Sequence, residues 1–255
     1  MGSKTASKTS ARPENRVFMR TVTHGFREIT YGDDPILRAV RSLYEETLGP
    51  SERIPWNWLA SFVHPVPEWQ RRSYLIVAER EYGARHKSVM GFVTGTYQPR
   101  FGGYLSYVAV DPRARGRGIG GALYRALIRR MRKTAYAMGR SIPCLMWDSR
   151  PPSPSDGPDV RANWESRLRL FKKVGGRWIE GVQFTSPNYL SPRMGDVPLE
   201  FFLKPVDDSV EDFTGPRLRR IVRGLLKQIY YLDIEGDDGE SLKQYAPLRL
   251  KPIKC

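Results

Sequence analysis

Two patterns of apolar residues predict most of the secondary structure of this chain. Over 36–48 and 217–231 the apolar residues recur every three or four positions, which is the spacing of a helix with one buried face. Elsewhere, short apolar runs predict strands. The predicted strands lie at 25–31, 74–78, 88–97, 107–110, 142–147, 178–184 and 199–203, and further helices at 54–63, 118–137 and 163–173. We therefore expect an α/β fold with one mixed sheet and helices packed on it.

The chain divides into three predicted parts. Residues 21–206 hold the predicted strands and four of the five helices, and are expected to form the main domain. Residues 1–20 are polar and basic, and we interpret them as a disordered tail. Residues 207–255 form an extension with one amphipathic helix, whose apolar stripe needs a surface to cover. That surface is expected on the main domain or, in a homodimer, between two copies.

Composition limits the class of protein and its compartment. With 255 residues and 40% hydrophobic content, the chain is long enough to bury a full core. No apolar run reaches the roughly 18 residues of a membrane span, and the N-terminus lacks the apolar centre of a secretory signal. The two cysteines, Cys144 and Cys255, form no disulfide framework, so we expect a cytoplasmic protein. The three histidines are scattered without the spacing of metal ligands, so no metal is expected.

The chain carries a large excess of positive charge. Its formal net charge is +15, which attracts anions and makes nucleic acid a partner to consider. The basic residues are spread along the chain, however, and aromatic residues do not alternate with them as on an RNA-binding surface. We interpret most of this charge as solvated helix surface and part of it as attraction for a phosphate-rich cofactor. Nucleic-acid binding remains an alternative.

The most informative segment follows the strand that ends at Val110. An Asp-Pro turn leads into a loop with glycines at 116, 118, 120 and 121, and a helix begins near Ile119. Amide groups at a helix start have no intrahelical partner, and glycine lets a phosphate approach them. Arg115 and Arg117 add positive charge at the same place. The segment is predicted to bind phosphate.

Three known phosphate-binding loops can be compared with this segment. The glycines at 116, 118 and 121 match the dinucleotide fingerprint, but the loop before them is too long and no acidic residue follows at the required distance. The ATP-binding loop requires Gly-Lys-Ser/Thr, whereas Ala122 follows Gly121 here. The third is Arg115-x-x-Gly118-x-Gly120 after a Val-x-Val strand end. It resembles the coenzyme A pyrophosphate loop of the GCN5-related N-acetyltransferase (GNAT) superfamily, and the order of predicted elements also agrees with this family.

The resemblance implies a fold, a cosubstrate and a reaction. The implied fold is the GNAT-type acyl-CoA N-acyltransferase fold, with a mixed, mostly antiparallel sheet flanked by helices, here with a C-terminal helical extension. Acetyl-CoA is implied as cosubstrate, held in a V-shaped gap between the strand ending at Val110 and the strand 142–147. The residues implied to bind it are Val108, Ala109, Val110, Arg115, Gly116, Arg117, Gly118, Ile119, Gly120 and Gly121. The acetyl group would pass directly to an amine-bearing acceptor.

The residues that handle protons are less well marked by the sequence. Many family members carry a tyrosine acid four residues before the glycine that ends the helix 163–173, but this chain has Phe171 there. Tyr104 stands where some relatives carry a glutamate base. Asp148, expected just past the strand 142–147, and Tyr189, in the loop 185–195, complete the candidates. A structural role is the alternative for each of the three. A degenerate fold that binds coenzyme A or a partner without turnover is therefore the alternative to an enzyme, and the acceptor is unidentified.

Overall fold

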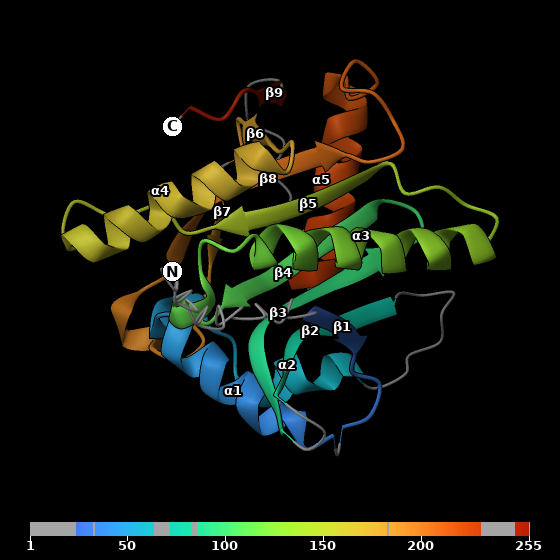
Figure 1. The fold of residues 1–255 in the computed structure, drawn as a ribbon. Helices are drawn as coiled ribbons and strands as arrows, with labels where there is room; N and C mark the ends of the chain where they lie inside the picture. The colour runs from blue at the N-terminus through green and yellow to red at the C-terminus, as the bar shows by residue number, and fades with distance from the viewer. Residues whose placement is uncertain are drawn as a thin grey trace, which may run out of the picture.

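A central β-sheet with helices on both faces forms the body of the molecule (Figure 1). The computed structural model describes residues 24–32, 34–63, 72–82, 86–182, 184–230 and 248–254. The predicted tail 1–20 and most of the extension beyond Tyr230 lie outside these residues. The helices are α1 (Ile36–Thr47), α2 (Trp56–Ala60), α3 (Ile119–Ala137), α4 (Pro158–Lys173) and α5 (Gly215–Tyr230), with single 3-10 turns at Pro50–Glu52, Ser61–Val63, Pro112–Ala114 and Pro192–Met194.

The sheet is mixed and mostly antiparallel. Its strands are β1 (His24–Glu28), β2 (Arg72–Tyr82), β3 (His86–Gln98), β4 (Gly102–Val110), β5 (Cys144–Ser149), β6 (Arg177–Glu180), β7 (Phe184–Ser186), β8 (Val197–Pro205) and β9 (Arg249–Lys251). They follow the spatial order β1-β2-β3-β4-β5-β8-β6-β9, and β7 pairs with β8. Among the paired strands that the structure describes, β4 and β5 alone run parallel. The predicted fold class is confirmed.

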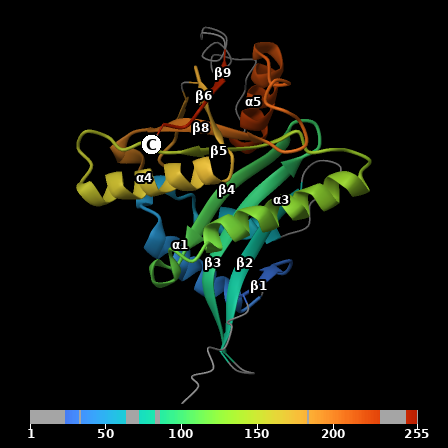
Figure 2. The same cartoon turned by 45° about the horizontal axis from the view of Figure 1, so that its top comes forward.

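The strands alternate their side chains between two apolar layers. On β2, Tyr74 and Ile76 pack into the layer that holds α3 and part of α4, whereas Leu75 and Val77 pack into the layer that holds α1. Successive side chains of a strand point to opposite faces of the sheet, so the sheet is buried on both sides. Figures 1 and 2 show α3 and α4 together over one face of the sheet.

Helix α5 covers a third apolar cluster, on the face of β4, β5 and β8 opposite α3. Five residues of its predicted stripe are buried: Leu218, Ile221, Val222, Leu225 and Leu226. They pack with Tyr104 of β4, with Cys144 and Met146 of β5, and with Phe201 and Leu203 of β8. The predicted C-terminal helix is thus present, and it fixes the last turn of α5 beside β4 and β5.

Three local predictions were wrong. Helix α4 begins at Pro158 rather than at 163, because a proline at the first helical position and Asp159 in the first turn favour a helix start there. The predicted strand 178–184 is two strands, β6 and β7, separated by Gly181 at φ 93°. Strand β9, which pairs with β6, was missed because three residues show no pattern.

Candidate active site

The site begins where β4 and β5 separate. These two strands pair over only three positions, with Gly103, Tyr104 and Leu105 opposite Leu145, Met146 and Trp147. Beyond Leu105, β4 continues along β3 to Val110, while β5 continues along β8 to Ser149. The edge of β4 from 106 to 110 is therefore free on the β5 side, which opens a gap in the sheet.

A bulge in β4 lies at the start of this gap. Leu105 pairs with Gly95 and Tyr107 pairs with Thr94, so Ser106 is an extra residue on its strand. A bulge leaves the extra residue out of the hydrogen-bond ladder and bends the strand. Ser106 lines the cavity described next. The bulge thus presents unpaired main chain of β4 to the gap.

A cavity of about 1000 Å³ fills the gap and extends to both faces of the sheet. Its lining includes all of β4 from Tyr104 to Val110, the end of β5 and the loop before α3. The opposite wall of the cavity is formed by α2, the loop after β7 and the last turn of α5. The strand end and glycine loop implied to bind a cosubstrate and the proton-handling candidates Tyr104, Asp148 and Tyr189 therefore lie around one cavity.

The glycine loop has the geometry expected of a phosphate-binding segment. Gly116 and Gly118 have φ of 76° and 78°, a region that residues with a Cβ rarely adopt. Gly118 is the N-cap of α3, and no side chain caps this helix end. The first intrahelical amide bond is donated by Ala122 to Gly118, so the amides of Ile119, Gly120 and Gly121 are free of such bonds.

Positive charge near the loop comes from Arg115 and Arg125. Arg115 lines the cavity and donates from Nε to the carbonyl of Val110 at 3.3 Å. Arg125, which the sequence analysis did not single out, also lines the cavity, and its Nη1 would lie 3.5 Å from a Cβ at Gly121. Within the described part of the chain, neither arginine forms an ion pair, although the charge of Arg115 contributes to the lowered pKa of Asp111. Arg117 is exposed and is not part of the lining, so the structure separates it from Arg115.

Asp148 is the centre of a hydrogen-bonded cluster on the other side of the gap. It lies within β5 rather than just past it, opposite Phe201 of β8. The hydroxyls of Tyr104 and Tyr230 both donate to Asp148 Oδ2, the second over 2.7 Å, and the two hydroxyl oxygens are 3.3 Å apart. All three side chains line the cavity. Tyr230 belongs to α5, and the sequence analysis did not predict it as a site residue.

The environment of Asp148 changes its acidity. Burial raises the pKa of this carboxyl group from 3.8 to about 6, the hydrogen bond from Tyr230 opposes that rise, and the charge of Glu52 adds to it. Burial and the negative charge of Asp148 raise the pKa of Tyr230 well above its ordinary value. At neutral pH the cluster therefore holds the Asp148 carboxylate and a protonated Tyr230 hydroxyl. A carboxylate with this pKa is suited to accept a proton near pH 7.

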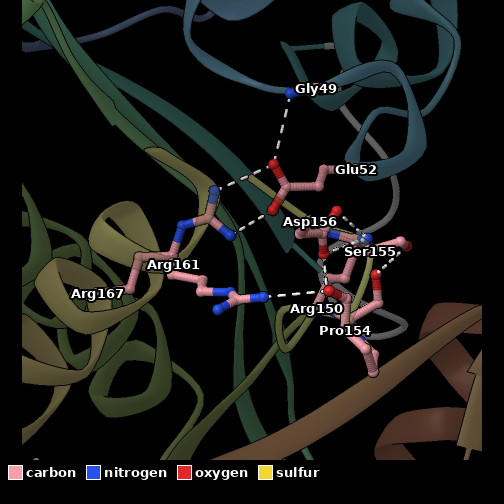
Figure 3. Close-up of polar contacts among 9 residues, drawn as sticks. Gly49, Glu52, Arg150, Pro154, Ser155, Asp156, Arg161 and Arg167 are labelled. Carbon is pink, nitrogen blue, oxygen red and sulfur yellow. Dashed lines mark hydrogen bonds and ion pairs between the residues drawn. The ribbon is translucent and has the colours of Figure 1, made fainter. Parts of the chain in front are cut away.

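An ion pair connects the two walls of the cavity. Arg167 of α4 donates from both terminal nitrogens to the carboxylate of Glu52, with 3.0 Å between Nη2 and Oε2 (Figure 3). Arg167 Nη1 also lies 3.3 Å from Ser149 Oγ. Arg150, at the end of β5, is paired with Asp156 at 2.8 Å in the same view. Glu52 and Asp148 are the acidic residues of the described lining, and Glu52 is neutralised by Arg167. Asp148 has no cationic partner among the described residues.

The remaining predicted residues occupy different surroundings. Tyr189 lines the cavity from the loop after β7, where its ring packs edge-to-face on Trp58 with 5.1 Å between centroids. Its hydroxyl forms no described hydrogen bond to Asp148, so it lies outside the cluster. Phe171 is buried against Trp147 and Phe202, with ring centroids 5.3 and 5.0 Å away. At this position the chain has an aromatic packing residue.

Three further features bear on the chemistry of the described residues: their potential metal ligands, their buried thiol and the character of their helices. In the residues it describes, no three His, Cys, Asp or Glu side chains gather as a metal-binding group. Cys144 is buried, and burial raises the pKa of its thiol, as expected for an inert core cysteine. None of the described helices combines the length and hydrophobicity needed to cross a membrane.

Comparison with protein families gives a match to part of the chain. Residues 37–142, which extend from α1 through the glycine loop and α3, match the model of the acetyltransferase (GNAT) family. Over this stretch, which is less than half of the chain, the protein is similar to the GNAT family, and its sheet and helices form the GNAT fold. A comparison with curated proteins gives no match.

Several solved structures have a similar arrangement of elements. The ribosomal-protein-S18-alanine N-acetyltransferase from Escherichia coli is 16% identical, with 75% of this chain and 99% of that chain covered and a TM-score of 0.46. NAA60 from Arabidopsis thaliana, solved in complex with acetyl-CoA, is 17% identical, with coverages of 73% and 100% and a TM-score of 0.49. The IAA acetyltransferase from Bacillus cereus is 17% identical, with coverages of 72% and 100% and a TM-score of 0.43.

Proposed function

We propose that this protein is an acetyl-CoA-dependent N-acetyltransferase that transfers the acetyl group directly to an amine. The observation that carries the proposal is one cavity that joins an uncapped glycine-rich helix start to Asp148, a carboxylate with no cationic partner among the described residues. The first feature suits a phosphate-bearing cosubstrate, and the second suits an acceptor that must lose a proton. Either feature alone would be compatible with binding without turnover.

The residues around the gap fit the parts of acetyl-CoA. The free amides of 119–121 and the unpaired Arg115 and Arg125 suit a pyrophosphate, which carries negative charge and only accepts hydrogen bonds. The free edge of β4 at Val108, Ala109 and Val110 suits a pantetheine arm, whose amides can pair with main chain as a strand would. When bound, acetyl-CoA supplies an acetyl thioester as the electrophile.

Proton handling is assigned to Asp148 and the tyrosines of the cluster. The Asp148 carboxylate accepts a proton from the acceptor ammonium, directly or through one water, which frees the nitrogen lone pair for attack on the thioester carbonyl carbon. The C–N bond forms, the C–S bond breaks, and the departing thiolate takes up a proton. A tyrosine hydroxyl, from Tyr104 or from Tyr189 on the opposite wall, is the candidate donor. Unpaired main chain at the β4 bulge can donate to the developing oxyanion.

Isothermal titration with acetyl-CoA tests the cosubstrate, and thiol release tests the reaction. We expect binding at micromolar concentration and release of free coenzyme A with at least one amine from a panel of polyamines, amino acids, aminoglycosides and peptide N-termini. No heat of binding at millimolar acetyl-CoA would overturn the proposal. Binding without thiol release from any amine would favour a degenerate, non-catalytic fold instead.

Arginine substitutions provide a finer test of the phosphate contacts. We expect Arg115→Ala and Arg125→Ala each to raise the Kd of acetyl-CoA by about tenfold or more, since a charge-assisted hydrogen bond contributes about 1.5–3 kcal/mol. The exposed Arg117, changed to alanine, should have a smaller effect, because its side chain is not part of the cavity lining. Titration calorimetry measures all three variants.

The control ligand is acetyl-pantetheine, which has the thioester and the pantetheine arm but no phosphate. Its affinity should be the same for the wild type and for the three arginine variants. An equal loss of affinity for both ligands would show that the arginines maintain the loop rather than bind phosphate.

A further inference from the structure

The C-terminal helix α5 reaches the cavity, although it lies outside the segment that matches the family. The family match ends at 142, whereas α5 spans Gly215–Tyr230. Its last two residues, Ile229 and Tyr230, line the cavity. Figure 1 shows α5 crossing behind β4 and β5, the two strands that open the gap. The helix is therefore in a position to contribute to the site as well as to stability.

Tyr230 is held in place by packing on both sides of its ring. Its centroid lies 4.8 Å from that of Phe184 on β7 and 6.5 Å from that of Tyr104, the latter edge-to-face. The rest of α5 is fixed by its buried apolar stripe on the sheet. A side chain fixed by packing loses little freedom when it forms a hydrogen bond, so the bond to Asp148 is pre-organised.

The hydrogen bonds to Asp148 are distributed unevenly between its two oxygens. Both phenol hydroxyls donate to Oδ2, whereas Oδ1 accepts no hydrogen bond from the described residues. Two donors on one oxygen hold the carboxylate in one orientation and leave the other oxygen available for a proton. The same donors favour the ionised form of the group.

We propose that α5 is part of the active site and that Tyr230 is a positioning residue, which with Tyr104 holds the Asp148 carboxylate ready to accept the proton of the acceptor amine. This inference rests on the proposed acetyl transfer. Tyr230 acts through Asp148 and takes no part in bond making. The extension that carries it thereby becomes a requirement for turnover, not only for folding.

Other ionisable groups near the cluster influence the pKa values of Asp148 and Tyr230. Glu52, in the 3-10 turn Pro50–Glu52 before α2, lies near enough to raise the pKa of Asp148. The charge of Glu52 is balanced by Arg167 of α4. Tyr107 of β4 and Tyr189 of the β7 loop face Tyr230. On β8, Glu200 pairs with Ser149 rather than with Asp148, so it lies on the other face of the sheet and does not face the cluster. Each of these side chains is still present when the Tyr230 hydroxyl is removed.

The test is Tyr230→Phe, which keeps the ring and removes only the hydroxyl. Thiol release with an amine that the wild type acetylates measures kcat/KM as a function of pH. The acidic limb of this profile should move to higher pH by about one unit, because the Asp148 carboxylate loses one hydrogen-bond donor and its pKa rises. Below pH 6 this lowers kcat/KM roughly five- to tenfold. The Kd of acetyl-CoA and the melting temperature should stay close to wild type, which shows that the fold is intact. Tyr136→Phe, on an α3 residue that is 86% exposed, is the matched control.

The outcomes separate this inference from the proposed function. If the wild type is active and Tyr230→Phe has the same pH profile, Tyr230 does not position the Asp148 carboxylate. A wild type that acetylates no amine would overturn the proposed function instead. In that case a carboxyl titration followed by ¹³C NMR, assigned with Asp148→Asn, still decides whether Tyr230 acts on Asp148. An unchanged carboxyl pKa in Tyr230→Phe would refute that coupling.

Discussion

Asp148→Asn is expected to lower kcat by a factor of about 10²–10⁴, the usual contribution of a general base. The reason is that asparagine cannot accept the proton of the acceptor ammonium, whereas its side chain keeps the shape that fits between β4, β8 and α5. Binding of acetyl-CoA should be nearly unchanged, because the residues assigned to the cosubstrate lie on β4 and before α3. Thiol release and titration calorimetry measure the two quantities separately.

The same variant should be more stable than the wild type at neutral pH. The pKa of Asp148 is raised from 3.8 to about 6 in the folded protein, so the folded state favours the protonated form of this group. Between those two pH values the folded state binds more protons than the unfolded state, and stability falls as the pH rises. The loss is on the order of 3 kcal/mol at pH 7. Asparagine removes this penalty.

Thermal unfolding at two pH values checks the sign of this effect. At pH 7.5 the melting temperature of Asp148→Asn should exceed that of wild type by about 6–12 °C, at roughly 2–4 °C per kcal/mol for a chain of this size. At pH 4, where Asp148 is mostly protonated in the folded protein, the difference should largely disappear. Glu165→Gln, on an exposed residue of α4, is the control and should change neither activity nor stability. Equal activity of Asp148→Asn and wild type would contradict the role of the carboxylate.

The half of the site around the glycine loop could be predicted from sequence because it is local. The end of β4, the turn and the start of α3 follow one another between 107 and 121, so one short motif holds the amides, the glycines and Arg115. The structure adds Arg125, which lies one helical turn beyond Gly121. Helix geometry predicts that a residue one turn beyond Gly121 lies near the loop. Because α3 is rich in basic residues, however, its sequence does not distinguish Arg125 from the other arginines.

The other half of the site depends on contacts between distant segments. Tyr104 and Asp148 are 44 residues apart, Asp148 and Tyr230 are 82 apart, and Glu52 and Arg167 are 115 apart. The apolar stripe of α5 predicts that the helix is buried on one side, but the stripe does not specify which strands it covers. The contact between Tyr230 and Asp148 therefore follows from the sheet order, in which β5 lies between β4 and β8. That order cannot be read from periodicity.

Gly118→Val is expected to abolish measurable binding of acetyl-CoA while the protein still folds. At Gly118 a Cβ would meet no protein atom within 4 Å, so the valine side chain would project into open space beside the free amides of α3. That is the space which the proposed pyrophosphate needs. The backbone cost is moderate, since a β-branched residue at φ 78° is strained by about 1–3 kcal/mol.

Gly139→Val gives a control with the same strain and a different location. Gly139 has φ of 64°, it follows the opposite end of α3, and a Cβ there also meets nothing within 4 Å. The melting temperatures of both variants should therefore fall by a similar amount. Gly118→Val alone should raise the Kd of acetyl-CoA, by at least about a hundredfold if the phosphate contacts of the loop are lost together. Equal affinity in the two variants would mean that acetyl-CoA does not approach the start of α3. The comparison thus distinguishes a steric block at the binding site from a general effect of backbone strain on the helix.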